Sequence, residues 1–131
     1  MNPPNTTFAR RVFLIAGIYG LLVMLPQYLM ETRIGSDYPP PITHAEYFYG
    51  FIGVTVAWQI LFLFLARDPL RYRTLMIPCM LEKLSLVPVF CILSFDGRFP
   101  PIMLPFIVID LVLGALFLAA YIKTKEPKTI S

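Results

Sequence analysis

Two adjacent charged residues, Glu82 and Lys83, stand in the middle of an otherwise apolar stretch from Leu75 to Ser94. A third ionisable residue, Asp110, lies near the middle of the next apolar stretch. Ionisable side chains inside a bilayer are costly, and they commonly mark ligand, ion or proton sites. A carboxylic acid that holds a proton there can act as a general acid. Glu82 is therefore the candidate catalytic residue if the chain carries out a reaction.

The stretch that carries Glu82 and Lys83 would insert poorly into a membrane by itself. Each buried charge costs roughly 2.5–3.5 kcal/mol, whereas each Leu, Ile, Phe or Val returns only about 0.3–0.6 kcal/mol. Eleven such residues lie between Leu75 and Phe95, so gain and cost nearly cancel. We therefore expect these charges to have partners on neighbouring helices.

The natural partner of Lys83 is Asp110, and we predict a structural ion pair between them. Glu82 points about 100° away from Lys83 around the helix and has no matched charge of its own. We expect Glu82 to be protonated at neutral pH, with Ser85 and Gln59 as its hydrogen-bond partners.

Polar residues of the other predicted helices lie within about one turn of the same level, at a rise of 1.5 Å per residue. The predicted ligand-binding set is Glu82, Ser85, Gln59, Thr55 and Tyr19. Pro78 and Pro88 flank the acid and each removes a backbone hydrogen bond, so kinks are expected to open a cavity there. The competing interpretation is a polar clamp that only fixes helix packing.

A second pair of polar residues, His44 and Glu46, lies at the start of the second apolar stretch. Thr43 and Glu46 have the spacing of a capping box, which gives Glu46 a structural role. His44 and Glu46 are also candidates for an acid–base or metal pair at the outer mouth. One histidine and one carboxylate are too few ligands, so we predict no metal site and no cofactor.

The composition predicts that these residues are positioned by membrane-spanning helices. Of 131 residues, 57% are hydrophobic and only 15% are charged, far too few charges for the surface of a soluble domain. Four apolar runs of about 20 residues can each cross a bilayer. We predict helices over about 12–30, 45–66, 69–94 and 101–122, in a single polytopic domain covering 1–131. The predicted fold is an all-α, four-helix transmembrane bundle with up-down-up-down topology.

The basic residues divide unevenly between the two sides of this bundle. Eight lie on one side: Arg10, Arg11, Arg67, Arg71, Arg73, Lys123, Lys125 and Lys128. Only Arg33 and Arg98 lie on the other. This positive-inside bias predicts cytoplasmic N- and C-termini in the inner or plasma membrane. Membrane orientation thus explains the excess of basic residues, so we expect no nucleic-acid partner.

Small residues and prolines predict how the helices pack and are connected. Ala16 and Gly20 share one face of the first helix, and the second helix has a stripe of Glu46, Gly50, Gly53 and Ala57 suited to close packing. Pro26 is expected to bend or end the first helix. The loop 31–43, with three consecutive prolines, is expected to be extended. Asp68 and Pro69 are expected to start the third helix.

Four helices, cytoplasmic termini and buried acids at Glu82 and Asp110 resemble the EXPERA-domain family of sterol isomerases and sigma-receptor-type lipid-binding proteins. That resemblance implies a membrane-embedded pocket lined by acids. It rests on the number and orientation of the helices and on these two acids, and on no sequence motif. Lys83 departs from a site that receives a cation, because it already supplies one. The segment 44–83 also resembles small four-helix bacterial membrane proteins.

Three functions follow as hypotheses. The favoured one is binding of a lipid or small amphiphile at the midplane site. The alternatives are an accessory or structural subunit of a larger membrane complex, and a lipid isomerase that uses Glu82 as acid. The expected partners are membrane lipid, a small hydrophobic ligand, and other membrane subunits or further copies of the chain.

Overall fold

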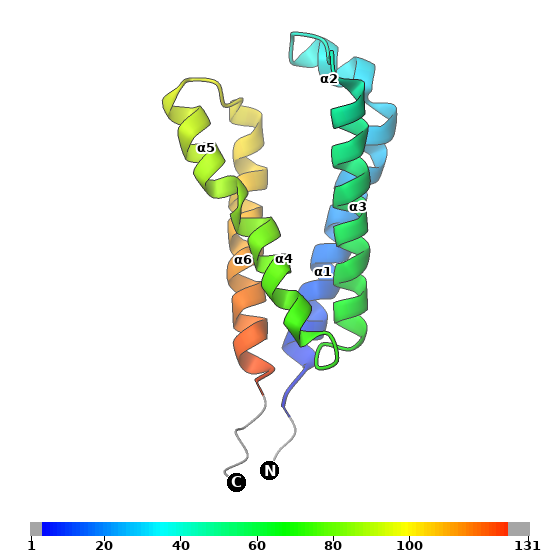
Figure 1. Ribbon diagram of the computed structural model, residues 1–131, viewed down its shortest axis with the longest axis vertical. Helices are drawn as coiled ribbons and strands as arrows, with labels where there is room; N and C mark the ends of the chain where they lie inside the picture. The colour runs from blue at the N-terminus through cyan, green and yellow to red at the C-terminus, as the bar shows by residue number, and fades with distance from the viewer. Residues whose placement is uncertain (1–3, 126–131) are drawn as a thin grey trace.

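The computed structural model describes residues 4–125, which form helices and turns and contain no strand. The α-helices are α1 (Thr7–Met24), α2 (Glu31–Asp37), α3 (Ala45–Arg67), α4 (Met76–Leu84), α5 (Leu86–Phe95) and α6 (Leu104–Lys123). Short 3-10 helices, η1 (Leu25–Leu29), η2 (Arg73–Leu75) and η3 (Pro101–Met103), adjoin α1, α4 and α6. Figure 1 shows this arrangement. Lys128, one of the predicted cytoplasmic basic residues, lies outside the described residues.

Four helical segments of the described chain are long and apolar enough to cross a membrane. They are Thr7–Leu29, Ala45–Arg67, Arg73–Phe95 and Pro101–Lys123. Each has 23 residues, which corresponds to about 34 Å at 1.5 Å per residue and matches a hydrocarbon core of about 30 Å. The predicted all-helical class with four long apolar helices is therefore confirmed.

The ends of these segments differ from the predicted boundaries at two places. The first helix begins at Thr7 rather than near residue 12, because the arginines at its start are tolerated at the membrane surface. The third begins at Arg73 rather than at residue 69. Asp68 does not cap a helix start; its Oδ1 accepts a hydrogen bond of 3.2 Å from the backbone N–H of Arg71 and closes a turn. Pro26 acts as expected, since α1 gives way to the 3-10 helix η1 there.

The connection between the first two spans is not the extended strut that its prolines predict. Residues Glu31–Asp37 form α2, and only the segment that follows, with the three prolines, is non-helical. The Tyr49 hydroxyl of α3 donates a 2.6 Å hydrogen bond to the Glu31 carboxylate. The rings of Tyr28 and Tyr49 stack with centroids 6.1 Å apart. These contacts hold the start of α2 against α3.

The spans pack as two pairs, α1 with α3 and α4 with α6 (Figure 1). Two arginines fix which ends meet. Arg10 Nη1 donates a 2.6 Å hydrogen bond to the carbonyl of Arg67, joining the start of α1 to the end of α3. Arg73 Nη2 donates at 2.8 Å to the carbonyl of Tyr121, joining the start of the third span to the end of α6.

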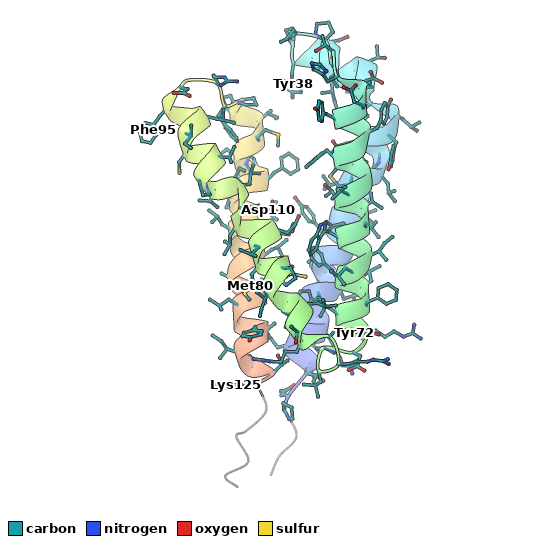
Figure 2. All side chains as sticks on the ribbon, in the orientation of Figure 1. Tyr38, Tyr72, Met80, Phe95, Asp110 and Lys125 are labelled. Atoms are coloured by element: carbon teal, nitrogen blue, oxygen red, sulfur yellow. The ribbon has the colours of Figure 1, made fainter. Side chains whose placement is uncertain are left out.

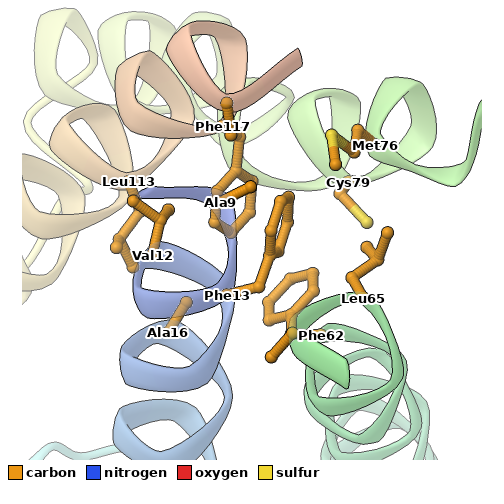
Figure 3. Packing of buried hydrophobic residues seen from close by; sticks show 12 residues of the cluster. Ala9, Val12, Phe13, Ala16, Phe62, Leu65, Met76, Cys79, Leu113 and Phe117 are labelled. Carbon is orange, nitrogen blue, oxygen red and sulfur yellow. The ribbon is translucent and has the colours of Figure 1, made fainter. Parts of the chain in front are cut away.

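A cluster of three phenylalanines holds the two pairs together near these ends. Phe13 stacks on Phe117 with ring centroids 4.4 Å apart, and Phe62 meets Phe117 edge-on at 5.0 Å. All three side chains have no exposed surface. Figure 3 shows that they come from α1, α3 and α6 and that Met76 and Cys79 of α4 lie beside them.

The third span is broken at Ser85, between α4 and α5. Pro88 explains the break, because it lacks the N–H that would pair with the carbonyl of Leu84. α4 packs against α6 and buries Met76, Cys79 and Lys83, whereas α5 has no buried residue. In Figure 1, α5 and the adjoining part of α6 diverge from α1 and α3.

Small residues permit close packing at α1 but not where the sequence predicts it on α3. A Cβ atom built on Gly17 would lie 2.7 Å from Leu63 Cδ2, and one on Gly20 would overlap the side chain of Gln59. By contrast, nothing lies within 4 Å of a Cβ on Gly50, and Ala57 is exposed. Gly53 is half-buried, and a Cβ on it would lie 3.4 Å from the Tyr28 hydroxyl. Gly50 and Ala57 of the predicted stripe therefore face outward, because α1 packs against the face of α3 that carries Gln59.

Candidate functional site

Lys83 is the centre of a three-residue charged cluster between α4 and α6. Its Nζ donates a 3.0 Å hydrogen bond to Asp110 Oδ1 of α6. The same Nζ lies 3.4 Å from Glu82 Oε2. The Lys83 side chain is 6% exposed, and those of Glu82 and Asp110 are 20% and 26% exposed. Figure 2 shows Asp110 beside the junction of α4 and α5.

The contact between Lys83 and Glu82 corrects one expectation from the sequence. Glu82 is not left without an opposite charge, because one amine serves both carboxylates. Adjacent side chains do diverge around a helix, but the flexible four-carbon stem of lysine lets its amine reach back to a neighbour. The cluster therefore holds two acids for one base, and it carries one net negative charge when all three groups are ionised.

The amine of Lys83 also faces α3. Its Nζ lies 5.6 Å from the ring centroid of Phe62, within the range of a cation–π interaction. Gly114 lets α6 approach α4 here, because a Cβ on it would lie 2.9 Å from Leu84 Cδ2. Lys83 thus joins α3, α4 and α6. The sequence does not predict Phe62 as a site residue, because nothing in its sequence context distinguishes it from the other phenylalanines of the span.

The expected hydrogen bonds of Glu82 to Ser85 and Gln59 are absent from the described residues. Ser85 Oγ donates to the backbone carbonyl of Glu82 at 3.2 Å, not to its carboxylate. Gln59 Nε2 donates to the carbonyl of Thr55 at 3.1 Å. Both side chains satisfy a carbonyl within four residues of themselves, which requires no rearrangement of the helices.

Two buried acceptor atoms consequently lack a donor among residues 4–125. They are Gln59 Oε1 on α3 and Glu82 Oε2 on α4, which has Lys83 at ion-pair distance but outside hydrogen-bond geometry. Gln59 is 1% exposed. Its amide oxygen lies against Gly20 of α1, where an added Cβ would overlap it, so this acceptor belongs to the seam between α1 and α3. Buried acceptors without a donor are uncommon, and each one needs an explanation.

The other predicted ligand-binding residues, Thr55, Tyr19 and Ser85, form no hydrogen bond to the charged side chains of the cluster among residues 4–125. Thr55 Oγ1 donates to the carbonyl of Phe51 at 2.7 Å, so its hydroxyl is used within α3. Tyr19 is half-buried and packs against the hydrophobic core. Ser85 is exposed at the break in the third span.

At the other end of α3, His44 Nδ1 lies 3.2 Å from Glu46 Oε1. Both side chains are 70% exposed. The predicted capping box is wrong: α3 begins at Ala45 with His44 as its N-cap residue, and no side chain caps it. Glu46 pairs with the imidazole instead.

Within the described residues, no group of three or more His, Cys, Asp or Glu side chains is arranged to hold a metal ion. Cys79 is buried and Cys91 exposed, and both are free thiols.

Two hollows lie outside this cluster, at the end where α1 starts and α3 finishes. The larger has a volume of about 450 Å³ and is lined by Arg10, Arg11, Leu14, Leu63, Ala66 and Arg67. The second, of about 360 Å³, is lined by Phe64, Arg67, Asp68, Arg71 and Tyr72. The sequence indicates basic residues at this end but not that they border a hollow.

Comparison with protein-family models, with curated proteins and with solved structures found no match for this chain. The resemblance to the EXPERA-domain family therefore remains one of layout, and no catalytic role is transferred from it to Glu82 or Asp110.

Proposed function

We propose that this chain is a multi-pass protein of the inner or plasma membrane that binds a lipid or small amphiphile at the Lys83 cluster. The four long apolar helices support the location. The contacts Arg10–Arg67 and Arg73–Tyr121 support an up-down-up-down bundle, because each joins the start of one span to the end of another. They also gather the basic residues at one end, which the positive-inside rule assigns to the cytoplasm together with both termini.

The observation that carries the binding proposal is Glu82 Oε2, a buried acceptor that has no hydrogen-bond donor among residues 4–125 and lies 3.4 Å from an amine that it shares with Asp110. It belongs to a cluster with one more acid than base. A ligand that brings a hydroxyl or ammonium donor would satisfy this acceptor, and an ammonium would also balance the charge. The ligand head group would then lie at the break between α4 and α5, and its apolar tail would lie along the exposed faces of α5, which no other helix covers.

The test is native mass spectrometry of the protein released gently from its membranes. The wild type is expected to retain a bound amphiphile, and Glu82→Gln is expected to retain about tenfold less, because the charged acceptor contributes on the order of 1.5 kcal/mol or more. Glu46→Gln is the matched control, since it removes an exposed acid from the same chain. Trp58 fluorescence reports whether each variant is folded. Equal retention by wild type and Glu82→Gln would refute the proposal.

Two observations favour the accessory-subunit alternative: α5 has no buried residue, and Gly50 and Ala57 of α3 are exposed. Such faces suit a neighbouring membrane helix, since small residues allow close approach in a bilayer. Co-purification with a fixed set of other membrane proteins, together with no retained amphiphile, would favour this function. Gly50→Leu would then reduce the co-purification, whereas it would leave amphiphile retention unchanged under the binding proposal.

A further inference from the structure

The end of the bundle opposite α2 carries basic residues whose surroundings differ from one another. Arg73 and Lys123 are already engaged by aromatic rings: Arg73 Cζ lies 3.8 Å from the ring centroid of Tyr121, and Lys123 Nζ lies 4.3 Å from that of Phe8. Arg10 is held across the seam between α1 and α3 by the carbonyl of Arg67. These three charges have structural roles.

Arg11 and the side chain of Arg67 are different. Both are exposed, and neither has a hydrogen-bond, ion-pair or ring partner among residues 4–125. Both border the hollow of about 450 Å³ whose other walls are Leu14, Leu63 and Ala66. The hollow is therefore apolar along the two helices and positively charged at its rim.

We infer that this groove binds one anionic phospholipid, with its phosphate at Arg11 and Arg67 and an acyl chain along Leu14 and Leu63. Guanidinium groups donate in pairs to phosphate oxygens, and basic side chains at a membrane surface attract anionic lipids. The occupant must be both anionic and apolar, because the rim supplies only donors and the wall supplies only hydrocarbon. A free phosphate would leave the apolar wall uncovered, and a neutral lipid would leave two cations without a counter-charge.

This inference rests on membrane insertion but not on the Lys83 cluster, because none of the three charged residues of that cluster lines the hollow. Arg10 prepares the groove by joining α1 to α3 through its 2.6 Å hydrogen bond. Arg67 borders the second hollow as well, so a head group larger than a single phosphate can extend toward Arg71. Phosphatidylglycerol is accordingly the probe of choice.

The experiment places the protein in nanodiscs of phosphatidylcholine that contain a minor fraction of phosphatidylglycerol with the same acyl chains. Native mass spectrometry then counts the lipids that remain bound after release. We expect one phosphatidylglycerol to be retained in preference to phosphatidylcholine. Arg11→Gln combined with Arg67→Gln should weaken that binding about 30-fold, since each basic residue at the surface changes affinity about fivefold.

The matched control is Arg33→Gln with Arg98→Gln, which removes the same charge from the opposite end and should leave binding unchanged. Arg11→Lys with Arg67→Lys keeps the charge and should retain most of the binding, which excludes misfolding as the cause of a loss. Equal retention of the two lipids by the wild type, or equal loss in the control, would overturn the inference.

Two further arms separate this site from other sources of the signal. Glycerophosphoglycerol, which has the head group but no acyl chains, should not displace the lipid; displacement at matched concentration would show a phosphate site rather than a lipid groove. Glu82→Gln should leave phosphatidylglycerol binding intact. Loss of that binding in Glu82→Gln but not in the double arginine variant would place the lipid at the midplane and refute the groove, while leaving the proposed function standing.

Discussion

Lys83 is the residue that joins the helices at the centre of the bundle. Its amine contacts two carboxylates and an aromatic ring from three helices, and 6% of the side chain is exposed. Removing it would leave Glu82 and Asp110 facing each other without a cation. Removing Asp110 would leave Lys83 paired with Glu82. The two substitutions are therefore unequal, although a simple ion pair would make them equal.

We predict that Lys83→Met lowers the free energy of unfolding by about 3 kcal/mol, the low end for a broken buried pair, because the carboxylates are partly exposed. Asp110→Leu should cost less. The double variant Lys83→Met/Asp110→Leu should be more stable than Lys83→Met alone, because it leaves one acid that can take up a proton. Unfolding in mixed micelles, followed by Trp58 fluorescence, measures all three. Equal losses in the two single variants would show that Glu82 does not share the amine.

The sequence alone predicts which residues form this cluster, because charges in an apolar run must find partners and the next span offers one acid. It does not predict that Glu82 shares the amine. That outcome depends on the flexible side chain of Lys83, which helix geometry does not determine. Depth predicts Gln59 as a partner of the Glu82 carboxylate, and a spacing of one turn predicts Ser85, yet both side chains donate to backbone carbonyls of their own helices.

At the scale of elements, two glycines of α1, Gly17 and Gly20, define the seam between α1 and α3. Gly20 leaves room for the buried side chain of Gln59, whereas Gly50 on the outer face of α3 has no neighbour within 4 Å of an added Cβ. The sequence identifies both as small residues at helical spacing but cannot say which face is covered. The structure shows that the covered face is the one that carries Gln59, whose side chain is 1% exposed and fills the space beside Gly20.

Gly20→Ala should therefore destabilise the protein by about 1–3 kcal/mol, the usual cost of overpacking a filled interface. Gly50→Ala is the matched control. It should be neutral or should stabilise α3 by up to about 1 kcal/mol, because alanine is the better helix former. The difference between the two unfolding free energies is the measurement, and Gly50→Ala as the more damaging change would contradict the packing of α1 on α3.

Helix limits show where sequence signals are ambiguous. Pro26 ends α1 as expected, and the proline at 88 coincides with the break at Ser85. Asp68 and Pro69, which have the pattern of a helix start, form a turn instead, because a carboxylate can accept from backbone N–H groups in either setting. The sequence does not predict the helix α2, because the three prolines that follow it indicate an extended path for the whole connection 31–43.

For the whole molecule, the arrangement of basic residues predicts the orientation in the membrane. A fluorescent protein fused after residue 131 should fold and fluoresce in the cytoplasm. Alkaline phosphatase fused after Arg98 should be active, because the positive-inside bias predicts that this connection lies on the opposite side of the membrane. Inactive phosphatase at Arg98 with a fluorescent C-terminus would mean that the third and fourth spans do not cross the membrane as a pair.

The ion pair between Lys83 and Asp110 has a consequence for how the chain is made. The two residues are 27 positions apart and lie on consecutive spans, so the span with Lys83 is made before the one with Asp110. Until the second span arrives, the adjacent Glu82 is the acid within reach of the amine. We therefore expect the translocon to retain the Arg73–Phe95 span until the following span has been made. The two spans should then enter the bilayer together as a helical hairpin.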